Sequence, residues 1–255
     1  MKNKLVIKIG TSTLTAGTNR ISFAVIESLA RQIVELKKNF DVVIVSSGAI
    51  ATARQFVEIN GYHKNVDSKQ AMAAIGQTKL MELYDNIFRT FGLNIAQILL
   101  TYRDFENDTA NENTRNTINK LWEVDYIPIV NENDTVSIEE IVLGDNDKLS
   151  ALVAVITNAD LLILVSDIDG IYTCNPHLHQ DAKLITNVSD LNSVTHCIEE
   201  KASTLGTGGM SSKVHAADIC MKNGVEMWIV NGQRANYIVK ALNEEIPFTK
   251  FSAKG

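Results

Sequence analysis

Short runs of consecutive apolar residues alternate along the chain with longer segments in which apolar residues recur every three or four positions. The short runs predict buried strands, because a strand covered on both faces carries apolar side chains at successive positions. We expect these strands near residues 5–9, 41–48, 94–100, 127–130, 161–165, 226–230 and 248–251. The longer segments predict helices near residues 23–38, 67–91, 111–123, 149–156, 214–221 and 237–242. This alternation predicts an α/β fold with a mostly parallel sheet and helices on both faces.

Polar residues stand where the first two strands end. Lys8 interrupts the first apolar run near its carboxyl end, and Ser47 and Gly48 lie at the carboxyl end of the second strand, directly before the start of another helix. Ligands of open α/β sheets bind at the carboxyl ends of the strands. The structural alternatives are an edge strand with an exposed Lys8 ammonium group and a Ser47 that only caps a helix. We favour a shared ligand crevice, because the pattern recurs.

Two polar segments, Asn131–Asp134 and Gly144–Asp147, follow the strand at 127–130 and flank a predicted hairpin over residues 136–142. Asn, Asp and Gly favour ordinary turns, so neither segment indicates a site by itself. Asp147 is also a candidate N-cap for the apolar helix that follows it. A capping role does not exclude a functional one.

The segment Leu205–Lys213 contains three glycines within four residues and ends in two serines and a lysine. Glycines let the backbone approach a ligand closely, and free N–H groups at a helix N-terminus attract anions. Lys213 adds a full positive charge there. We therefore predict a phosphate site rather than a flexible surface turn. The spacing differs from that of the P-loop, in which the lysine directly follows a glycine.

Bulk composition narrows the class of protein. The 255 residues are 45% hydrophobic and 21% charged, as is typical of a globular protein. A net charge of −6 without a basic cluster argues against a nucleic-acid partner. No apolar run reaches the roughly 18 residues of a membrane helix, and we expect no membrane partner. Three widely spaced cysteines favour reduced thiols and a cytoplasmic location.

Cys174, His177 and His179 lie close together in the sequence and raise the question of a metal site. Their spacing matches no closed four-ligand site, and no second cluster completes it. We therefore expect residues 172–179, which include Pro176, to form an exposed turn, and we predict no metal ligand.

Five segments occur in a fixed order along the chain, namely Lys8–Ser12, Val45–Ile50, Asn131–Asp134, Gly144–Asp147 and Gly206–Lys213. In this combination they closely resemble the glutamate 5-kinases of the amino acid kinase family, from residue 4 to about residue 232. Gly10–Thr11 is the glutamate 5-kinase form of the first segment, where acetylglutamate kinases and aspartokinases typically have Lys-x-Gly-Gly. The resemblance implies a three-layer α/β/α sandwich with a mostly parallel central sheet of about eight strands. It also implies ATP-dependent phosphorylation of L-glutamate to L-glutamyl 5-phosphate, the first step of proline biosynthesis.

The resemblance implies three groups of site residues. The catalytic group is Lys8 and Lys213, which contact the transferred phosphoryl group, and Asp147, which holds both lysines in position. L-glutamate is bound by Ser47, Asp134 and Asn146. ATP is bound by Lys8, Ser166, Asp167, Thr207, Gly208, Gly209, Met210, Ser211, Ser212 and Lys213.

The resemblance also sets expectations for the assembly, the metal and the domains. Relatives are usually dimers or tetramers, so we expect a homo-oligomer. We expect magnesium (Mg²⁺) with the ATP, held by phosphate oxygens and water rather than by a protein ligand. Many bacterial relatives carry a C-terminal PUA domain, whereas this chain ends at Gly255 and is expected to be a single kinase domain over residues 1–255. Asn175 stands where relatives often have Asp, which leaves the detail of that loop open.

Two alternatives remain open. Another kinase of the same fold would act on aspartate, acetylglutamate, carbamate or a nucleotide. Asn131–Asp134 with Asn146 favours a substrate that has a free amino group, which counts against acetylglutamate and nucleotides. A non-catalytic sensor of an amino acid or nucleotide would not need Lys8 and Lys213, and both are present.

Overall fold

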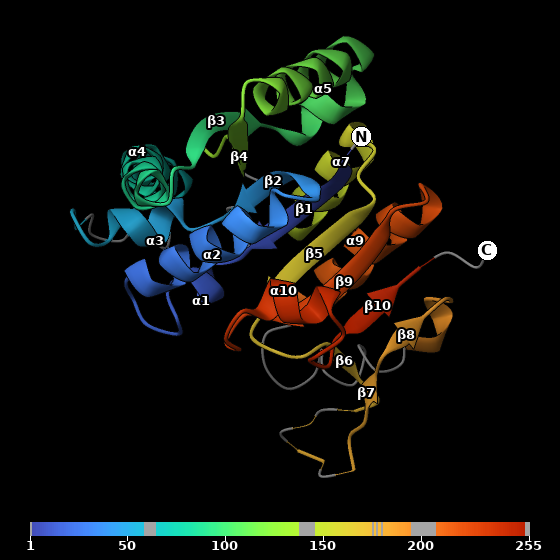
Figure 1. Ribbon diagram of the computed structural model, residues 1–255. Coiled ribbons are helices and arrows are strands. Elements are labelled where there is room, and N and C mark those ends of the chain that lie inside the picture. The colour runs from blue at the N-terminus through green and yellow to red at the C-terminus, as the bar shows by residue number, and fades with distance from the viewer. Residues whose placement is uncertain are drawn as a thin grey trace.

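The computed structural model describes residues 2–58, 65–137, 146–174, 176, 178–179, 181–194 and 208–252. The strands of its large sheet are β1 (Asn3–Ile9), β2 (Phe40–Ser46), β3 (Asn94–Leu100), β4 (Tyr126–Glu132), β5 (Leu161–Ser166), β8 (Asn187–Val188), β9 (Glu226–Asn231) and β10 (Thr249–Phe251). They lie in the order β3-β4-β2-β1-β5-β9-β10-β8 (Figure 1). β10 runs antiparallel to β9, and the other neighbouring strands are parallel. The expected sheet of about eight mostly parallel strands is confirmed.

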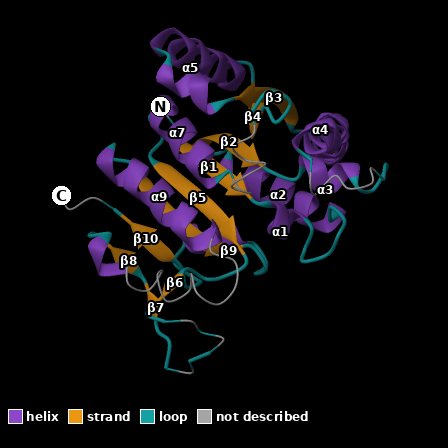
Figure 2. Cartoon of the chain, turned by 180° about the vertical axis from the view of Figure 1, so that it is seen from behind, coloured by secondary structure: helices purple, strands orange, loops and turns teal. Residues whose placement is uncertain are grey.

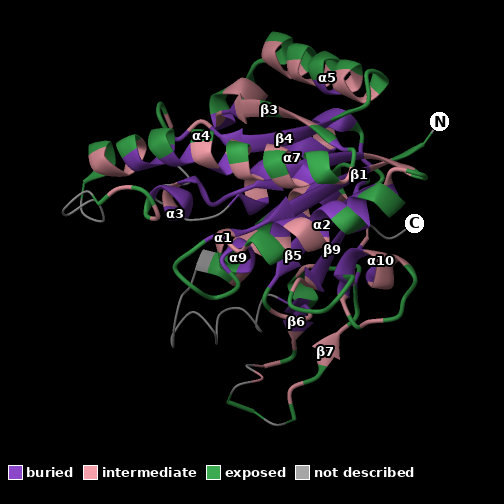
Figure 3. Ribbon diagram, turned by 60° about the vertical axis from the view of Figure 1, so that its left-hand side comes forward, coloured by how far each residue is buried: buried purple, intermediate pink, exposed green. Residues whose placement is uncertain are grey.

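Helices cover both faces of this sheet (Figures 1 and 2). They are α1 (Thr11–Leu14), α2 (Phe23–Leu36), α3 (Ala49–Ala53), α4 (Val66–Thr90), the 3-10 helix η1 (Tyr102–Glu106), α5 (Asp108–Glu123), α7 (Asp147–Thr157), α9 (Gly208–Lys222) and α10 (Tyr237–Leu242). One apolar core joins the sheet to α2, α4 and α10, and a second joins it to α5, α7 and α9. The central strands are buried between these layers, whereas the outward sides of α4 and α5 are exposed (Figure 3). The predicted three-layer α/β/α arrangement is confirmed.

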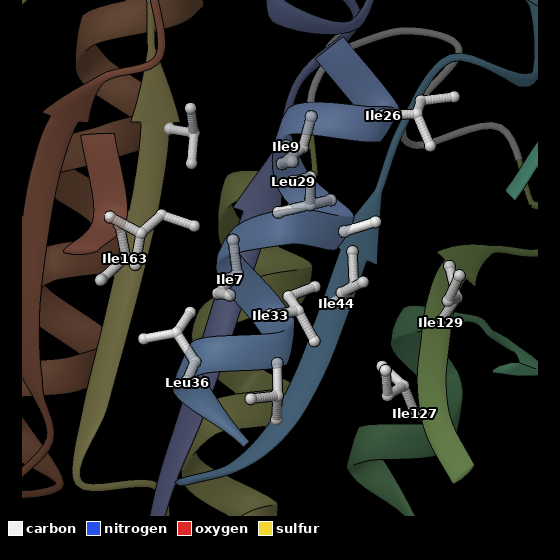
Figure 4. Close-up of a cluster of buried hydrophobic side chains, with 14 of the residues drawn as sticks. Ile7, Ile9, Ile26, Leu29, Ile33, Leu36, Ile44, Ile127, Ile129 and Ile163 are labelled. Atoms are coloured by element: carbon white, nitrogen blue, oxygen red, sulfur yellow. The ribbon is translucent and has the colours of Figure 1, made fainter. Parts of the chain in front are cut away.

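The alternation of side chains along β1 directs them into the two cores. Ile7 and Ile9 pack on the face covered by α2 (Figure 4), whereas Val6 packs on the face covered by α7 and α9. Lys8 has the same parity as Val6, so its side chain points towards α7 and α9. Lys8 also pairs with Val45 of β2 and with a residue of β5, which places it in the middle of the sheet. The edge-strand alternative for Lys8 is therefore wrong.

The largest boundary error concerns α9. Periodicity predicted this helix from residue 214, but it begins at Gly208, so that Gly208–Lys213 forms its first turns rather than a loop before it. Glycine and serine have low intrinsic helix propensity, which hid these turns from the sequence. Met210 and Val214 pack against the second core, and such tertiary contacts routinely override propensity.

Smaller differences occur elsewhere along the chain. Asn146, not Asp147, occupies the N-cap position of α7, and Asp147 is the first helical residue. Val136 lies in a turn, whereas the second arm of the predicted hairpin lies outside the described residues. The short helices α1 and η1 were not predicted, because four or five residues carry no measurable periodicity. None of the described helices is both long and apolar enough to cross a membrane.

The contact between α3 and α4 depends on a glycine. A Cβ atom at Gly76 of α4 would lie 1.7 Å from the carbonyl oxygen of Ala49, the first residue of α3. Such a distance is far shorter than any van der Waals contact, so the two helices approach this closely only because residue 76 has no side chain. This contact fixes α4 against the turn that follows β2.

Candidate active site

A buried carboxylate joins two lysines from distant parts of the chain. The Nζ atom of Lys8 lies 2.6 Å from Oδ1 of Asp147, and Nζ of Lys213 lies 2.9 Å from Oδ2 of the same residue. Ser212 donates a further hydrogen bond to Asp147 Oδ2 at 3.0 Å. The side chains of Lys8, Asp147 and Lys213 are 4%, 0% and 13% exposed. We call Lys8, Asp147 and Lys213 the paired cluster.

Three elements supply the paired cluster. β1 points Lys8 towards α7 and α9, α7 begins with Asp147, and the early turns of α9 carry Lys213. The chain makes room for the Lys8 ammonium group at Gly10, where a Cβ atom would lie 3.3 Å from its Nζ. A side chain at residue 10 would therefore press on the lysine that the strand positions.

The charges of the paired cluster control the protonation of its carboxylate. Burial alone would raise the pKa of Asp147, but the positive charges of Lys8 and Lys213 and their hydrogen bonds outweigh burial and hold the pKa below its ordinary value. Asp147 is therefore ionised at neutral pH. Two ammonium groups against one carboxylate leave one net positive charge among these three residues, which suits an anionic ligand.

A second group of buried polar residues is built differently. Ser47 Oγ, Asp134 Oδ1 and Asn146 Oδ1 are buried and have no hydrogen-bond partner among the described residues. Buried polar atoms in folded proteins are nearly always hydrogen-bonded, so each exception requires an explanation. A polar ligand is one source of the missing partners. We call Ser47, Asp134 and Asn146 the unpaired cluster.

A chain of side-chain amides fixes the orientation of Asn146. Its Nδ2 donates to the backbone oxygen of Ser46 at 3.2 Å and to Asn131 Oδ1 at 2.8 Å. Asn131 Nδ2 donates in turn to Gln77 Oε1 at 2.8 Å, and Gln77 Nε2 donates to Gln97 Oε1 at 3.4 Å. Because its nitrogen is engaged twice, Asn146 presents its oxygen as an acceptor.

The carboxyl group of Asp134 is less acidic than usual. Burial raises its pKa to about 7, and the nearby charge of Glu132 adds to the effect. Asp134 follows the carboxyl end of β4, as Ser47 follows the carboxyl end of β2. β2 and β4 are neighbours in the sheet, so both residues belong to the same edge.

The remaining predicted residues lie at the carboxyl end of β5 and at the start of α9. Ser166 is buried at the end of β5 and donates to the exposed Asp167 at 3.2 Å. Apart from its chain neighbours and its own helix backbone, a Cβ atom at Gly209 would meet none of the described residues within 4 Å. Gly208 is the first residue of α9, Met210 packs on the second core, and Ser211 is exposed. Thr207 lies outside the described residues.

Direct contacts join Lys8, Asp147, Ser212 and Lys213, and they link Asn146 to the backbone beside Ser47. The sequence interpretation missed Gln77 and Gln97. Gln77 is a polar residue on the buried side of α4, directly after Gly76, and a buried amide without an obvious partner was the available sign. Its partners come from β4 and β3, which periodicity alone does not bring together.

The chain is similar to known proteins over nearly its whole length. The sequence profile described as "Amino acid kinase family" matches residues 3–231. "Glutamate 5-kinase 2" of Pseudoalteromonas translucida is 43% identical over 249 residues, which is 97% of this chain and 68% of that protein. "Glutamate 5-kinase" of Clostridium acetobutylicum is 43% identical over 254 residues, covering 99% of this chain and 95% of that protein.

A solved structure, that of UMP kinase from Ureaplasma parvum, superimposes with a TM-score of 0.69 at 18% identity and covers 100% of both chains. At this identity the likeness shows a shared fold. The profile match extends from β1 to the end of β9 and thus includes every described residue of both clusters. The chain belongs to the amino acid kinase family.

Proposed function

We propose that this chain is a glutamate 5-kinase. It transfers the γ-phosphoryl group of ATP to the side-chain carboxylate of L-glutamate and forms ADP and L-glutamyl 5-phosphate, the first step of proline biosynthesis. The identity of 43% to two proteins named glutamate 5-kinase, over nearly the whole chain, supports this substrate. The observation that carries the reaction class is the pair of lysines, Lys8 and Lys213, held on one buried carboxylate.

The chemistry requires positive charge rather than a base. The side-chain carboxyl group of glutamate has a pKa of about 4.3, so it is already ionised at neutral pH and needs no proton removed. The obstacle is the approach of an anion to the polyanionic phosphate chain. Phosphoryl transfer is catalysed mainly by positioning and by stabilising charge. Lys8 and Lys213 supply that charge at the transferred group, and Asp147 keeps both ammonium groups in place.

The unpaired cluster has the donors and acceptors that L-glutamate requires. The α-ammonium group of the substrate offers three hydrogens, which Asp134 Oδ1 and Asn146 Oδ1 accept. Ser47 Oγ donates to a substrate carboxylate. This role explains why these buried atoms have no hydrogen-bond partner among the described residues.

ATP occupies the side formed by β5 and α9. The N-terminus of α9 directs backbone N–H groups and the positive end of the helix dipole to the phosphates. Gly208, Gly209 and Ser211 belong to that first turn, together with Met210. Ser166 and Asp167 line the neighbouring strand end. Thr207 is proposed to contact ATP from the sequence resemblance alone.

Mg²⁺ fits this site through the phosphate oxygens. Asp147 is committed to two lysines and Ser212, and the raised pKa of Asp134 reflects a site that disfavours a bare carboxylate. Neither therefore serves as a direct ligand, and a hydrated ion bound to phosphate matches the usual behaviour of Mg²⁺. Bound there, the ion neutralises part of the phosphate charge.

The assembly and location proposed here rest on the sequence. We propose a cytoplasmic homo-oligomer, a dimer or a tetramer, as is usual in this family. Cys174 and Cys220 are free thiols, in keeping with a reducing compartment. Sedimentation equilibrium on the purified chain measures the oligomeric state directly.

One experiment separates the proposed acceptor from its alternatives. ADP release is measured with L-glutamate, L-aspartate, N-acetylglutamate, carbamate and UMP, and the acyl phosphate is trapped with hydroxylamine as the hydroxamate. We expect ADP and hydroxamate in equal amounts with L-glutamate and much slower turnover with the others. Preferred turnover of another acceptor would reassign the substrate. Binding of ATP and glutamate without any ADP would instead indicate a sensor.

A further inference from the structure

A short hairpin lies beside β8 and β10 and extends away from the large sheet (Figure 1). Its strands β6 (Ile171–Tyr172) and β7 (Leu184–Ile185) are antiparallel. Pairing continues one step further, because Thr173 N donates to Lys183 O at 2.9 Å and Lys183 N donates to Thr173 Oγ1 at 3.1 Å. The two arms of the hairpin are thus held together on the strand side of Cys174.

The outer part of this hairpin brings three metal-binding side chains together. The backbone N–H of Ala182 donates to the carbonyl oxygen of His179 at 3.3 Å, which forms a turn on the returning arm. One ligand atom from each of Cys174, His179 and Asp181 lies within 4.8 Å of the other two. Cys174 belongs to the outgoing arm and is half-buried, whereas His179 and Asp181 belong to the returning arm and are exposed.

We propose that Cys174, His179 and Asp181 form a binding site for a divalent transition-metal ion, with Zn²⁺ as the favoured occupant. The site is independent of the kinase reaction and uses none of its residues. The spacing of Cys174, His177 and His179 predicts only a turn here, and Asp181 is not among these three residues. His177 lies outside the described residues and is not counted as a ligand.

The donor atoms select the ion. A thiolate and an imidazole favour Zn²⁺ over Mg²⁺ or Ca²⁺, which prefer oxygen ligands alone. Zinc bonds of about 2.3 Å to sulfur and about 2.0–2.2 Å to nitrogen and oxygen put neighbouring ligand atoms roughly 3.5 Å apart in a tetrahedron. The three ligand atoms lie within 4.8 Å of one another, so each pair has to close by at most about 1.3 Å, which rotation of the side chains can supply. Three protein ligands leave the fourth position for water.

Metal titration of the full chain tests this proposal. The protein is purified without an affinity tag, stripped with a chelator and titrated with Zn²⁺ in competition with a chromogenic chelator. We expect one ion per chain, and Co²⁺ in its place should give a thiolate-to-metal absorption band. Cys174→Ser should abolish the band. Cys174→Ser, His179→Asn and Asp181→Asn should each weaken Zn²⁺ binding at least about tenfold. His215→Asn and Asp190→Asn, which alter groups outside the cluster, should bind like the wild type.

Several results would overturn the proposal. They are the lack of stoichiometric binding, a Co²⁺ complex without a thiolate band, or equal Zn²⁺ affinity in the wild type and in Cys174→Ser. Circular dichroism and the melting temperature verify that each variant is folded. If a variant does not fold, the Co²⁺ spectrum of the wild-type chain still decides whether a thiolate binds the metal.

Discussion

The side chains of Lys8, Asp147 and Lys213 satisfy one another, whereas Ser47, Asp134 and Asn146 each keep one oxygen without a hydrogen-bond partner among the described residues. Both clusters lie at the carboxyl ends of the central strands, and both are buried. In the paired cluster the opposite charges already contact one another without a ligand, so the proposed reaction would need little reorganisation of them. In the unpaired cluster the buried oxygens without a described partner cost free energy, and a bound polar ligand would offset that cost.

The difference predicts separate roles in the proposed phosphoryl transfer: the paired cluster stabilises the transition state, and the unpaired cluster binds glutamate. Changes in the paired cluster should act on kcat, because they remove charge stabilisation that matters most in the transition state. Changes in the unpaired cluster should act on the KM for glutamate, because they remove ground-state contacts. Variants of single residues can separate an effect on kcat from an effect on the KM for glutamate.

The largest effect is expected for the two lysines. Lys8→Ala and Lys213→Ala should each lower kcat by at least about 100-fold, by analogy with the loss of one preorganised electrostatic donor. Steady-state ADP release measures this. Lys222→Ala is the matched control, since Lys222 lies on the same helix and forms an exposed pair with Asp218, and its kcat should not change. A lysine variant with wild-type kcat and only a raised KM would contradict a role of that lysine in stabilising the transition state.

Asp134→Asn should change the KM for glutamate and leave kcat nearly unchanged. The loss of a charge-assisted hydrogen bond to the substrate ammonium, worth about 1.5–3 kcal/mol, should raise the KM for glutamate roughly tenfold or more while kcat changes little. Asp108→Asn, which alters an exposed carboxylate on α5, is the control. An unchanged KM in Asp134→Asn would show that this carboxylate does not bind glutamate.

The raised pKa of Asp134 predicts opposite pH trends for binding and stability. Only the ionised carboxylate attracts an ammonium group, so glutamate affinity should weaken as the pH falls through about 7. The folded chain binds this proton more tightly than the unfolded chain does, so the stability linked to it is present at low pH and is lost as the pH rises through about 7. Thermal melts measure the stability trend, and the KM for glutamate measures the binding trend, both at pH values below and above about 7. In Asp134→Asn both contributions should vanish, and a profile identical to that of the wild type would assign the titration to another group.

The smallest effect is expected in the amide chain. Gln77→Ala removes the acceptor that orients Asn131 and, through it, Asn146, so the KM for glutamate should rise about fivefold, as expected for one lost hydrogen bond. Gln97→Ala should have a weaker effect, because its contact with Gln77 is longer, at 3.4 Å. Equal KM values in both variants and the wild type would indicate that Asn146 is held by its bond to Ser46 alone. A matching loss of kcat would instead link the amide chain to the paired cluster.

The sequence was most informative where residues have a strong preference for one type of secondary structure. Runs of β-branched residues predicted the central strands, whereas the ligand crevice expected to be shared by Lys8 and Ser47 stays a prediction. The contact of Lys8 with Asp147 was expected only from the family resemblance, because periodicity fixes the face of a side chain and not its partner. The roles of these residues in the reaction remain predictions.

The sequence was least informative where the structure depends on contacts between elements that are distant in the chain. The first turns of α9 were missed because Gly208 and Gly209 have poor helix propensity, and their packing partners come from other elements. Gln77 and Gln97 were missed because a glutamine usually indicates a solvent-exposed position. Asp181 was missed as a neighbour of Cys174, because only the pairing of the hairpin arms brings the two together.

The close contact at Gly76 bears on how this enzyme is redesigned. α3 leaves the turn that carries Ser47, and the residue after Gly76 begins the amide chain that orients Asn146. A methyl group at residue 76 would push α3 and α4 apart, and it would disturb both the turn that carries Ser47 and the amide chain that begins at Gln77. A mutant library that aims at a larger or smaller acceptor therefore gains nothing from varying residue 76. It keeps a usable scaffold when it holds this glycine constant and varies Ser47, Asp134 and Asn146.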